Sequence, residues 1–124
     1  MVWYPSVDDV VYANYIALSL GDDKHPHRLR RSRESIEAVL DRVVQAEREG
    51  ITRQAAMLMK GLAELHAFDG GNHRTAFVVA AVFLRQNGRR MRIERFGDAY
   101  AFISHLEHKS IVQIQEWIER GSAH

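Results

Sequence analysis

The stretch HAFDGGNHRTAFVVAAVFL, residues 66–84, decides how the rest of the chain is organised. Its second part, residues 76–84, is an unbroken apolar run, and a helix that is apolar on all sides must be surrounded by protein. We therefore expect a central helix that Asn72 caps and that ends at Asn87-Gly88. Its first part, residues 66–75, is a polar loop between two segments that we expect to be buried. The side chains and backbone N–H groups of such a loop can bind a ligand.

Upstream of this stretch, apolar residues recur with the period of amphipathic helices. The clearest stripe begins at Ile36 and repeats at three- and four-residue intervals to Val44. Serine and threonine hydroxyls stand where helix N-caps are needed. Three helices are expected: residues 6–20 capped by Ser6, residues 33–48 capped by Ser32 or Ser35, and a third helix that Thr52 caps and that ends near His66.

Downstream, residues 89–95 alternate basic and apolar side chains, which predicts an extended connector or an edge strand. Gly97-Asp98 can begin a fifth helix that buries Ala99, Ile103 and Leu106. Ser110 can cap a sixth helix. The predicted fold is all-α, a compact bundle of about six helices around a central apolar helix.

The composition is that of one soluble globular domain covering residues 1–124, with 46% hydrophobic and 27% charged residues. The chain has no cysteine, which excludes disulfides and thiolate zinc sites. A net charge of +1 gives no electrostatic case for nucleic acid. We expect no signal peptide, because the N-terminus MVWYPSVDDVV has no basic region followed by an apolar region. We expect no membrane span, because the longest apolar run is far shorter than the roughly 20 residues that cross a bilayer. The expected location is the cytoplasm.

The loop at residues 66–75 combines a base with an anion site. The first N–H groups of a helix beginning near Asn72 have no partner within that helix, and its dipole makes this end positive. Gly70-Gly71 lets the backbone approach a ligand closely, and Arg74 adds a planar charged donor. His66, at the end of the preceding helix, can take a proton from an attacking hydroxyl. A base next to an anion site suits phosphoryl or nucleotidyl transfer to a hydroxyl.

These residues resemble the signature of the Fic/Doc family, HxFx(D/E)GNxR, and its Doc branch form HxFxDxNKRT. The likeness extends to RTAFVVAAVFLRQNGRRM after the motif, to IEAVLDRVVQ before it, and to SIVQIQEWIERG near the C-terminus. The resemblance implies an all-α Fic/Doc-like fold, which agrees with the helices expected from periodicity. It also implies transfer of AMP or phosphate from ATP or another nucleoside triphosphate to a protein hydroxyl.

The resemblance assigns roles residue by residue. His66 matches the general base, and Phe68 matches the aromatic that anchors the loop in the core. The resemblance assigns nucleotide and phosphate binding to the residues of the glycine turn and the start of the helix: Gly70, Gly71, Asn72, His73, Arg74 and Thr75.

The chain departs from the family pattern at three positions. The acidic ligand of Mg²⁺ falls at position 70, where this chain has Gly70, and Asp69 stands one residue early as a candidate metal ligand. His73 occupies the position that is Gly in AMP-transferring members and Lys in Doc, and a cationic histidine lies nearer to Lys. Phe77 stands where many Fic proteins have a second arginine, as in the Doc branch.

The inhibitory pattern of the family, (S/T)xxxE(G/N), is absent from the chain, and the nearest sequence, AEREG, has Gln45 at the Ser/Thr position. An inhibitor would then be a separate partner, as in a toxin–antitoxin pair. The leading interpretation is a Doc-like toxin that modifies a protein target, possibly a translation factor. Two alternatives stay open: a catalytically impaired relative that binds a nucleotide or a partner, and a helical interaction protein whose match to the motif is fortuitous.

Overall fold

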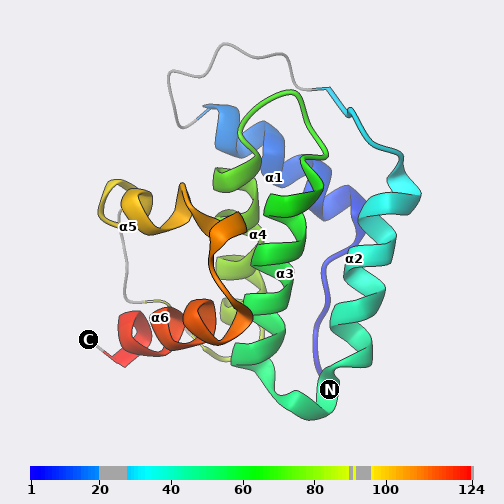
Figure 1. The fold of residues 1–124 in the computed structure, drawn as a ribbon. Coiled ribbons are helices and arrows are strands. Elements are labelled where there is room, and N and C mark those ends of the chain that lie inside the picture. The colour runs from blue at the N-terminus through cyan, green and yellow to red at the C-terminus, as the bar shows by residue number, and fades with distance from the viewer. Residues whose placement is uncertain (20–27, 90, 92–95, 124) are drawn as a thin grey trace.

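The computed structural model describes residues 1–19, 28–89, 91 and 96–123, and within these ranges the chain is an all-α bundle (Figure 1). The predicted fold class is confirmed. The helices, in chain order, are α1 (Val7–Ser19), α2 (Arg33–Gln45), the short 3₁₀ helix η1 (Glu47–Glu49), α3 (Ile51–Leu65), α4 (Asn72–Gln86), α5 (Phe96–Ile103), the 3₁₀ helix η2 (Leu106–His108) and α6 (Ile111–Ala123).

Three of the predicted N-caps are confirmed by hydrogen bonds. The hydroxyl of Ser6 accepts from the backbone N–H of Asp9 at 3.1 Å, and Ser32 and Ser110 accept in the same way at α2 and α6. The prediction that Thr52 caps α3 is wrong. Gly50 occupies the N-cap with φ +95°, and its carbonyl accepts from Gln54 N at 3.0 Å, so the helix begins before Thr52. The second predicted helix is also shorter than 33–48, because its last turn is the separate η1.

The centre of the bundle is shared by α3 and α4, which pack against each other over most of their length (Figure 1). On the outside, α1 packs on α4, whereas α2 and α6 pack on α3. Buried α4 residues include Ala76, Val79 and Phe83, as expected for the apolar run. The expectation that this helix is covered on every side is wrong at Val82, which is 41% exposed and lines a surface cavity between α1 and α4.

Two expectations for the second half of the chain have different outcomes. The predicted connector over residues 89–95 lies mostly outside the described residues. The fifth helix begins at Phe96 rather than at Gly97-Asp98, and Leu106 belongs to η2 instead of α5, although it is buried as predicted.

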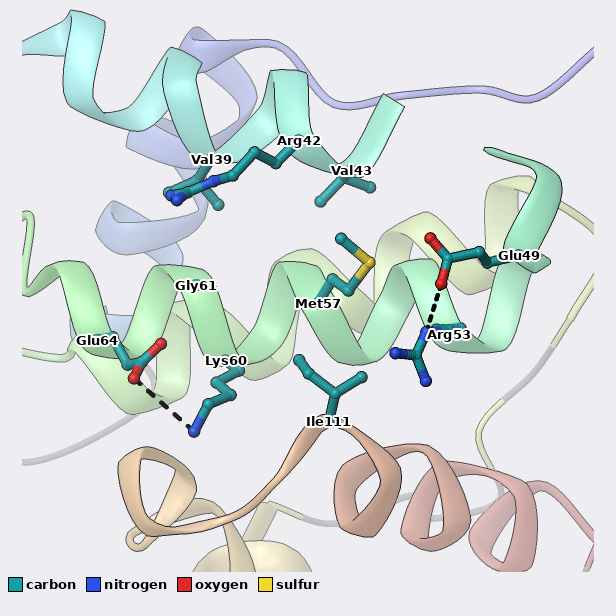
Figure 2. Close-up of a pocket in the computed structure, with 10 residues that line it drawn as sticks. All are labelled: Val39, Arg42, Val43, Glu49, Arg53, Met57, Lys60, Gly61, Glu64 and Ile111. Carbon is teal, nitrogen blue, oxygen red and sulfur yellow. Dashed lines mark hydrogen bonds and ion pairs between the residues drawn. The ribbon is translucent and has the colours of Figure 1, made fainter. Parts of the chain in front are cut away.

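A surface cavity of about 350 Å³ lies between α2, α3 and the start of α6 (Figure 2). Two ion pairs lie along it: Arg53 of α3 with Glu49 of η1 at 2.7 Å, and Lys60 with Glu64, both of α3, at 3.7 Å. None of the helices in the described part of the chain has the length and apolar character needed to cross a membrane.

Candidate functional site

The loop that joins α3 to α4 is bounded by two left-handed residues. His66 is the C-cap of α3 with φ 49° and ψ 53°, and Gly71 is the N-cap of α4 with φ 71° and ψ 20°. A non-glycine residue in this region is uncommon and is associated with strain. The sharp reversal at His66 brings the end of α3 next to the start of α4, so the predicted base and the predicted anion site lie at the same end of the bundle (Figure 1).

The motif loop is held on one side by residues 28–31, which precede α2. Leu29 and Phe68 form an isolated antiparallel bridge. The carbonyl of Ala67 accepts from Arg30 N at 2.7 Å, and Asp69 N donates to the carbonyl of Arg28 at 3.1 Å. These backbone bonds satisfy polar groups of the loop that would otherwise lack partners.

Asp69, the candidate metal ligand, is surrounded by arginine. Its Oδ2 lies 2.8 Å from Nε of Arg28, and its Oδ1 lies 3.7 Å from Nε of Arg30. Its side chain is only 16% exposed, whereas those of the two arginines are largely exposed. As placed, the carboxylate stabilises the contact between the loop and residues 28–31, and Arg28 and Arg30 offset its charge. The described residues contain no group of three or more His, Asp or Glu side chains that could hold a metal ion.

Phe68 and Asn72 shape the inside of the loop. Phe68 is 2% exposed and belongs to the core. The side chain of Asn72 closes a ring with Phe68, accepting from its N–H at 3.0 Å and donating to its carbonyl at 2.9 Å. The prediction that Asn72 caps α4 is therefore wrong, because its amide turns back to the loop and the N-cap is Gly71.

Asn14 of α1 ties the glycine turn to α4. It is fully buried, and its Nδ2 donates to the carbonyl of Gly70 at 2.9 Å and to Oγ1 of Thr75 at 3.1 Å. Thr75 in turn donates to the carbonyl of Gly71 at 2.7 Å. Thr75 is 2% exposed, so its hydroxyl organises the turn from within the protein instead of facing a ligand.

Gly71 is required both by its φ of +71° and by the space around it. A Cβ on this residue would lie 3.1 Å from Cδ2 of Leu18 and 3.5 Å from Nδ2 of Asn14. Gly88 offers a matched comparison, since its φ is +79° but nothing lies within 4 Å of an added Cβ.

We expect Gly88→Ala to lower the free energy of unfolding by about 1 kcal/mol through backbone strain alone. For Gly71→Ala we expect a loss of about 2 kcal/mol, because the added methyl also presses on Leu18. Urea unfolding of the two variants side by side measures the difference. An equal cost for both would mean that Leu18 yields freely and that only the positive φ requires glycine at position 71.

A cavity of about 180 Å³ opens at the N-terminus of α4. It is lined by residues of the motif and of α5: Gly71, Asn72, His73, Arg74, Tyr100, Ile103 and Ser104. Pockets for whole drug-sized ligands usually start at about 300 Å³, so this cavity has room for phosphate groups and leaves the rest of a nucleotide outside it. The structure thus brings Gly71, Asn72, His73 and Arg74 together around one cavity. Gly70 and Thr75 are buried and do not line it.

The side chain of Glu107, from η2, meets both histidines of the motif. His73 Nε2 forms a hydrogen bond with Glu107 Oε1, and His66 Nε2 lies 3.6 Å from Glu107 Oε2. The two imidazole rings face each other edge to face, with centroids 6.2 Å apart. Three titratable groups from three elements therefore gather beside the cavity.

Glu107 is held in its charged form by this surrounding. Partial burial, the largest single influence, raises the pKa of the carboxyl. The hydrogen bond with His73, a backbone hydrogen bond and electrostatic interactions with His73 and His66 act in the opposite direction. Together they outweigh burial, and the pKa of Glu107 lies below its usual value.

Sequence reasoning missed both Asn14 and Glu107. Asn14 carried a signal, because it lies four residues after Val10 on the apolar face of α1, where a polar residue needs an internal partner. Glu107 carried no such signal. Its partners His73 and His66 are 34 and 41 residues away in the chain, and a local sequence pattern does not show which distant residues meet.

The fold and this loop together define a class: an all-α protein in which a histidine at a helix end stands beside a glycine-bounded helix N-terminus. The model of the Fic/DOC family matches residues 20–84, which is more than half of the chain. The chain therefore belongs to the Fic/DOC family, whose members generally transfer AMP or phosphate to protein targets. A search of curated proteins finds no match to the chain.

Proposed function

We propose that this protein is a Doc-like toxin that transfers a phosphoryl group, or else AMP, from ATP or another nucleoside triphosphate to a hydroxyl of a protein target. The observation that carries the proposal is the position of His66 at the end of α3, beside a cavity that Gly71, His73 and Arg74 line. Family membership supplies the reaction class. His73 and Phe77, at positions where Doc proteins differ from AMP-transferring ones, favour the Doc branch and phosphoryl transfer.

In this proposal, the N-terminus of α4 and Arg74 hold the phosphates of the nucleotide. The N-terminal N–H groups and the dipole of a 15-residue helix attract anions, and a guanidinium can bind phosphate oxygens in a bidentate manner. The cavity of about 180 Å³ fits the phosphates. His66, 49% exposed, is accessible to an acceptor hydroxyl on a protein surface and would take its proton as the hydroxyl attacks.

Mg²⁺ would neutralise phosphate charge in such a reaction, and it commonly binds through one or two carboxylates together with the substrate phosphates. The residues described do not fit this role well as they stand, because Arg28 and Arg30 hold Asp69 and position 70 is glycine. No step of the proposed reaction is therefore assigned to a metal ligand of this chain.

The test is incubation with ATP that carries either a γ- or an α-phosphate label, in the presence of a cell extract that supplies acceptor proteins. Transfer of the γ label is expected, and transfer of the α label would mean AMP transfer instead. A labelled translation factor would support the proposed target class. Labelling of no protein from either nucleotide, with Mg²⁺ or Mn²⁺ supplied, would overturn the catalytic proposal.

Gly70 and the arginine contacts of Asp69 favour a second candidate, a catalytically impaired relative that keeps the anion site and binds a nucleotide or a partner protein. Calorimetry with ATP distinguishes the two. Binding that is equally tight with and without Mg²⁺, without turnover, supports the impaired relative, and a gain of activity in Gly70→Asp would identify the missing acid as the cause.

We further propose a separate antitoxin as the partner that restrains the protein, since the chain lacks the inhibitory pattern of the family. Co-expression with the gene next to its own, followed by co-purification, tests this partner. Growth arrest that the neighbouring gene does not relieve would contradict it.

A further inference from the structure

We propose that Glu107 is a positioning residue for His66, holding the imidazole toward the phosphate cavity and stabilising the positive charge that the ring acquires when it takes the acceptor's proton. This inference rests on the proposed role of His66 as the general base, and it concerns a residue outside the family motif.

The distances set the role of the carboxylate. Nε2 of His66 lies 3.6 Å from Oε2 of Glu107, which is too far for a hydrogen bond. Glu107 therefore does not occupy this nitrogen with a hydrogen bond. A positive charge on the ring at that distance is still attracted to the carboxylate, which is 28% exposed. Glu107 is fixed on its other side by the hydrogen bond to His73, so its second oxygen remains directed at His66.

The backbone of η2 is held in place independently of the two histidines. Nζ of Lys60, on α3, donates to the carbonyls of Glu107 at 3.2 Å and Lys109 at 2.5 Å. Leu106, the neighbouring residue, is fully buried in the core. Because η2 is anchored by a buried leucine and by a lysine of α3, the carboxylate of Glu107 is presented to the motif by a rigid support.

The acceptor hydroxyl oxygen attacks a phosphorus of the nucleoside triphosphate, its O–H bond breaks, and the proton moves to His66. The P–O bond to the leaving group breaks, and the electron pair leaves with the nucleoside diphosphate, or with pyrophosphate if AMP is transferred. Glu107 keeps no proton throughout. Its negative charge pairs with the positive charge that the imidazolium acquires in this step. A preorganised carboxylate stabilises such a developing charge.

The charges around Glu107 come from each element packed against it. His66 follows α3, His73 belongs to α4, and Lys60 of α3 binds the backbone carbonyl. Within its own segment, His108 and Lys109 follow Glu107 in the sequence. Since these groups are cationic or can become so, replacement of Glu107 leaves a cluster in which an added positive charge on His66 is disfavoured.

The test is Glu107→Gln, which keeps the shape and a hydrogen-bonding group but removes the charge. We expect the maximal rate of transfer to fall about tenfold or more, with little change in the KM for the nucleotide, because only the charged transition state loses stabilisation. The acid limb of the pH–rate profile should move to lower pH, because the imidazolium loses the neighbouring carboxylate that favours it. Glu107→Asp, with the charge drawn back by one methylene, should give an intermediate result.

A readout independent of activity is the titration of the His66 ring followed by NMR, assigned with the His66→Asn variant. Its midpoint should fall in Glu107→Gln and remain unchanged in the control Glu116→Gln, which removes an exposed carboxylate of α6. An unchanged midpoint, or a transfer rate and acid limb like those of the wild type, would overturn the inference. A shifted midpoint in a protein that transfers no label would support the coupling of Glu107 to His66 and would instead contradict the proposed catalytic function.

Discussion

Replacement of His66 by glycine or asparagine is expected to lower the rate of transfer by about 10²–10⁴-fold, the usual contribution of a positioned general base. His66, the proposed base, is 49% exposed and lies next to His73, which lines the cavity at the start of α4. Among the variants proposed for this protein, we expect this one to have the largest effect on activity.

The same substitutions have an unusual expected effect on stability. His66 adopts φ 49°, where an L-residue with a β-carbon is strained by about 1–2 kcal/mol. Glycine relieves that strain but costs about 0.5–1 kcal/mol of conformational entropy, so the free energy of unfolding of His66→Gly should equal that of the wild type or exceed it by up to about 1.5 kcal/mol. Asparagine tolerates this region better than most residues and should be nearly neutral.

Denaturant unfolding together with the labelled-ATP assay checks this prediction. His66→Ala is the matched control, because alanine removes the ring and keeps the strain, so it should be the least stable of the three variants. Transfer by His66→Gly at the rate of the wild type would remove His66 from the mechanism. Lower stability of His66→Gly would mean that the contact with Glu107 stabilises the fold more than the backbone strain destabilises it.

Replacement of Asn14 is expected to have the largest effect on stability. Asn14→Ala leaves the carbonyl of Gly70 without its buried donor and opens a small cavity, which should cost about 2–4 kcal/mol. Asn14→Asp keeps the size but replaces the donor by an oxygen that faces the Gly70 carbonyl and Thr75. We expect this variant to lose about 3 kcal/mol or more at neutral pH, since it buries a carboxylate against the carbonyl oxygen of Gly70.

The stability of Asn14→Asp should depend on pH. Burial favours the neutral acid, so the folded-state pKa of the new carboxyl would lie above its unfolded value, and the lost stability should return as the pH falls. Urea unfolding of Asn14→Asp between about pH 7 and pH 4 measures this recovery. Ser19→Ala, at the exposed end of the same helix, should change stability by less than about 0.5 kcal/mol. A neutral effect of Asn14→Ala would show that the glycine turn holds its shape without α1.

Much of the helical architecture was predictable because its causes are local. Apolar residues at helical spacing and a hydroxyl at the N-cap act within one or two turns, and Ser6, Ser32 and Ser110 cap the helices that they were predicted to cap. The errors arose where backbone conformation replaced side-chain capping. Gly50 and Gly71 begin α3 and α4 with positive φ, which leaves Thr52 and Asn72 within the helices that they were expected to cap.

The sequence by itself determined the helical class and the grouping of His66, Asn72 and Arg74 in one loop, since residues so close in the chain must lie close in space. Only the tertiary structure decided which of them face the cavity, that arginines hold Asp69, and that Asn14 supports the glycine turn from 56 residues away. The same is true of Glu107, which meets His66 and His73 because Leu106 is buried and Lys60 fixes η2. Such contacts depend on how the helices pack, and periodicity within each helix carries no information about them.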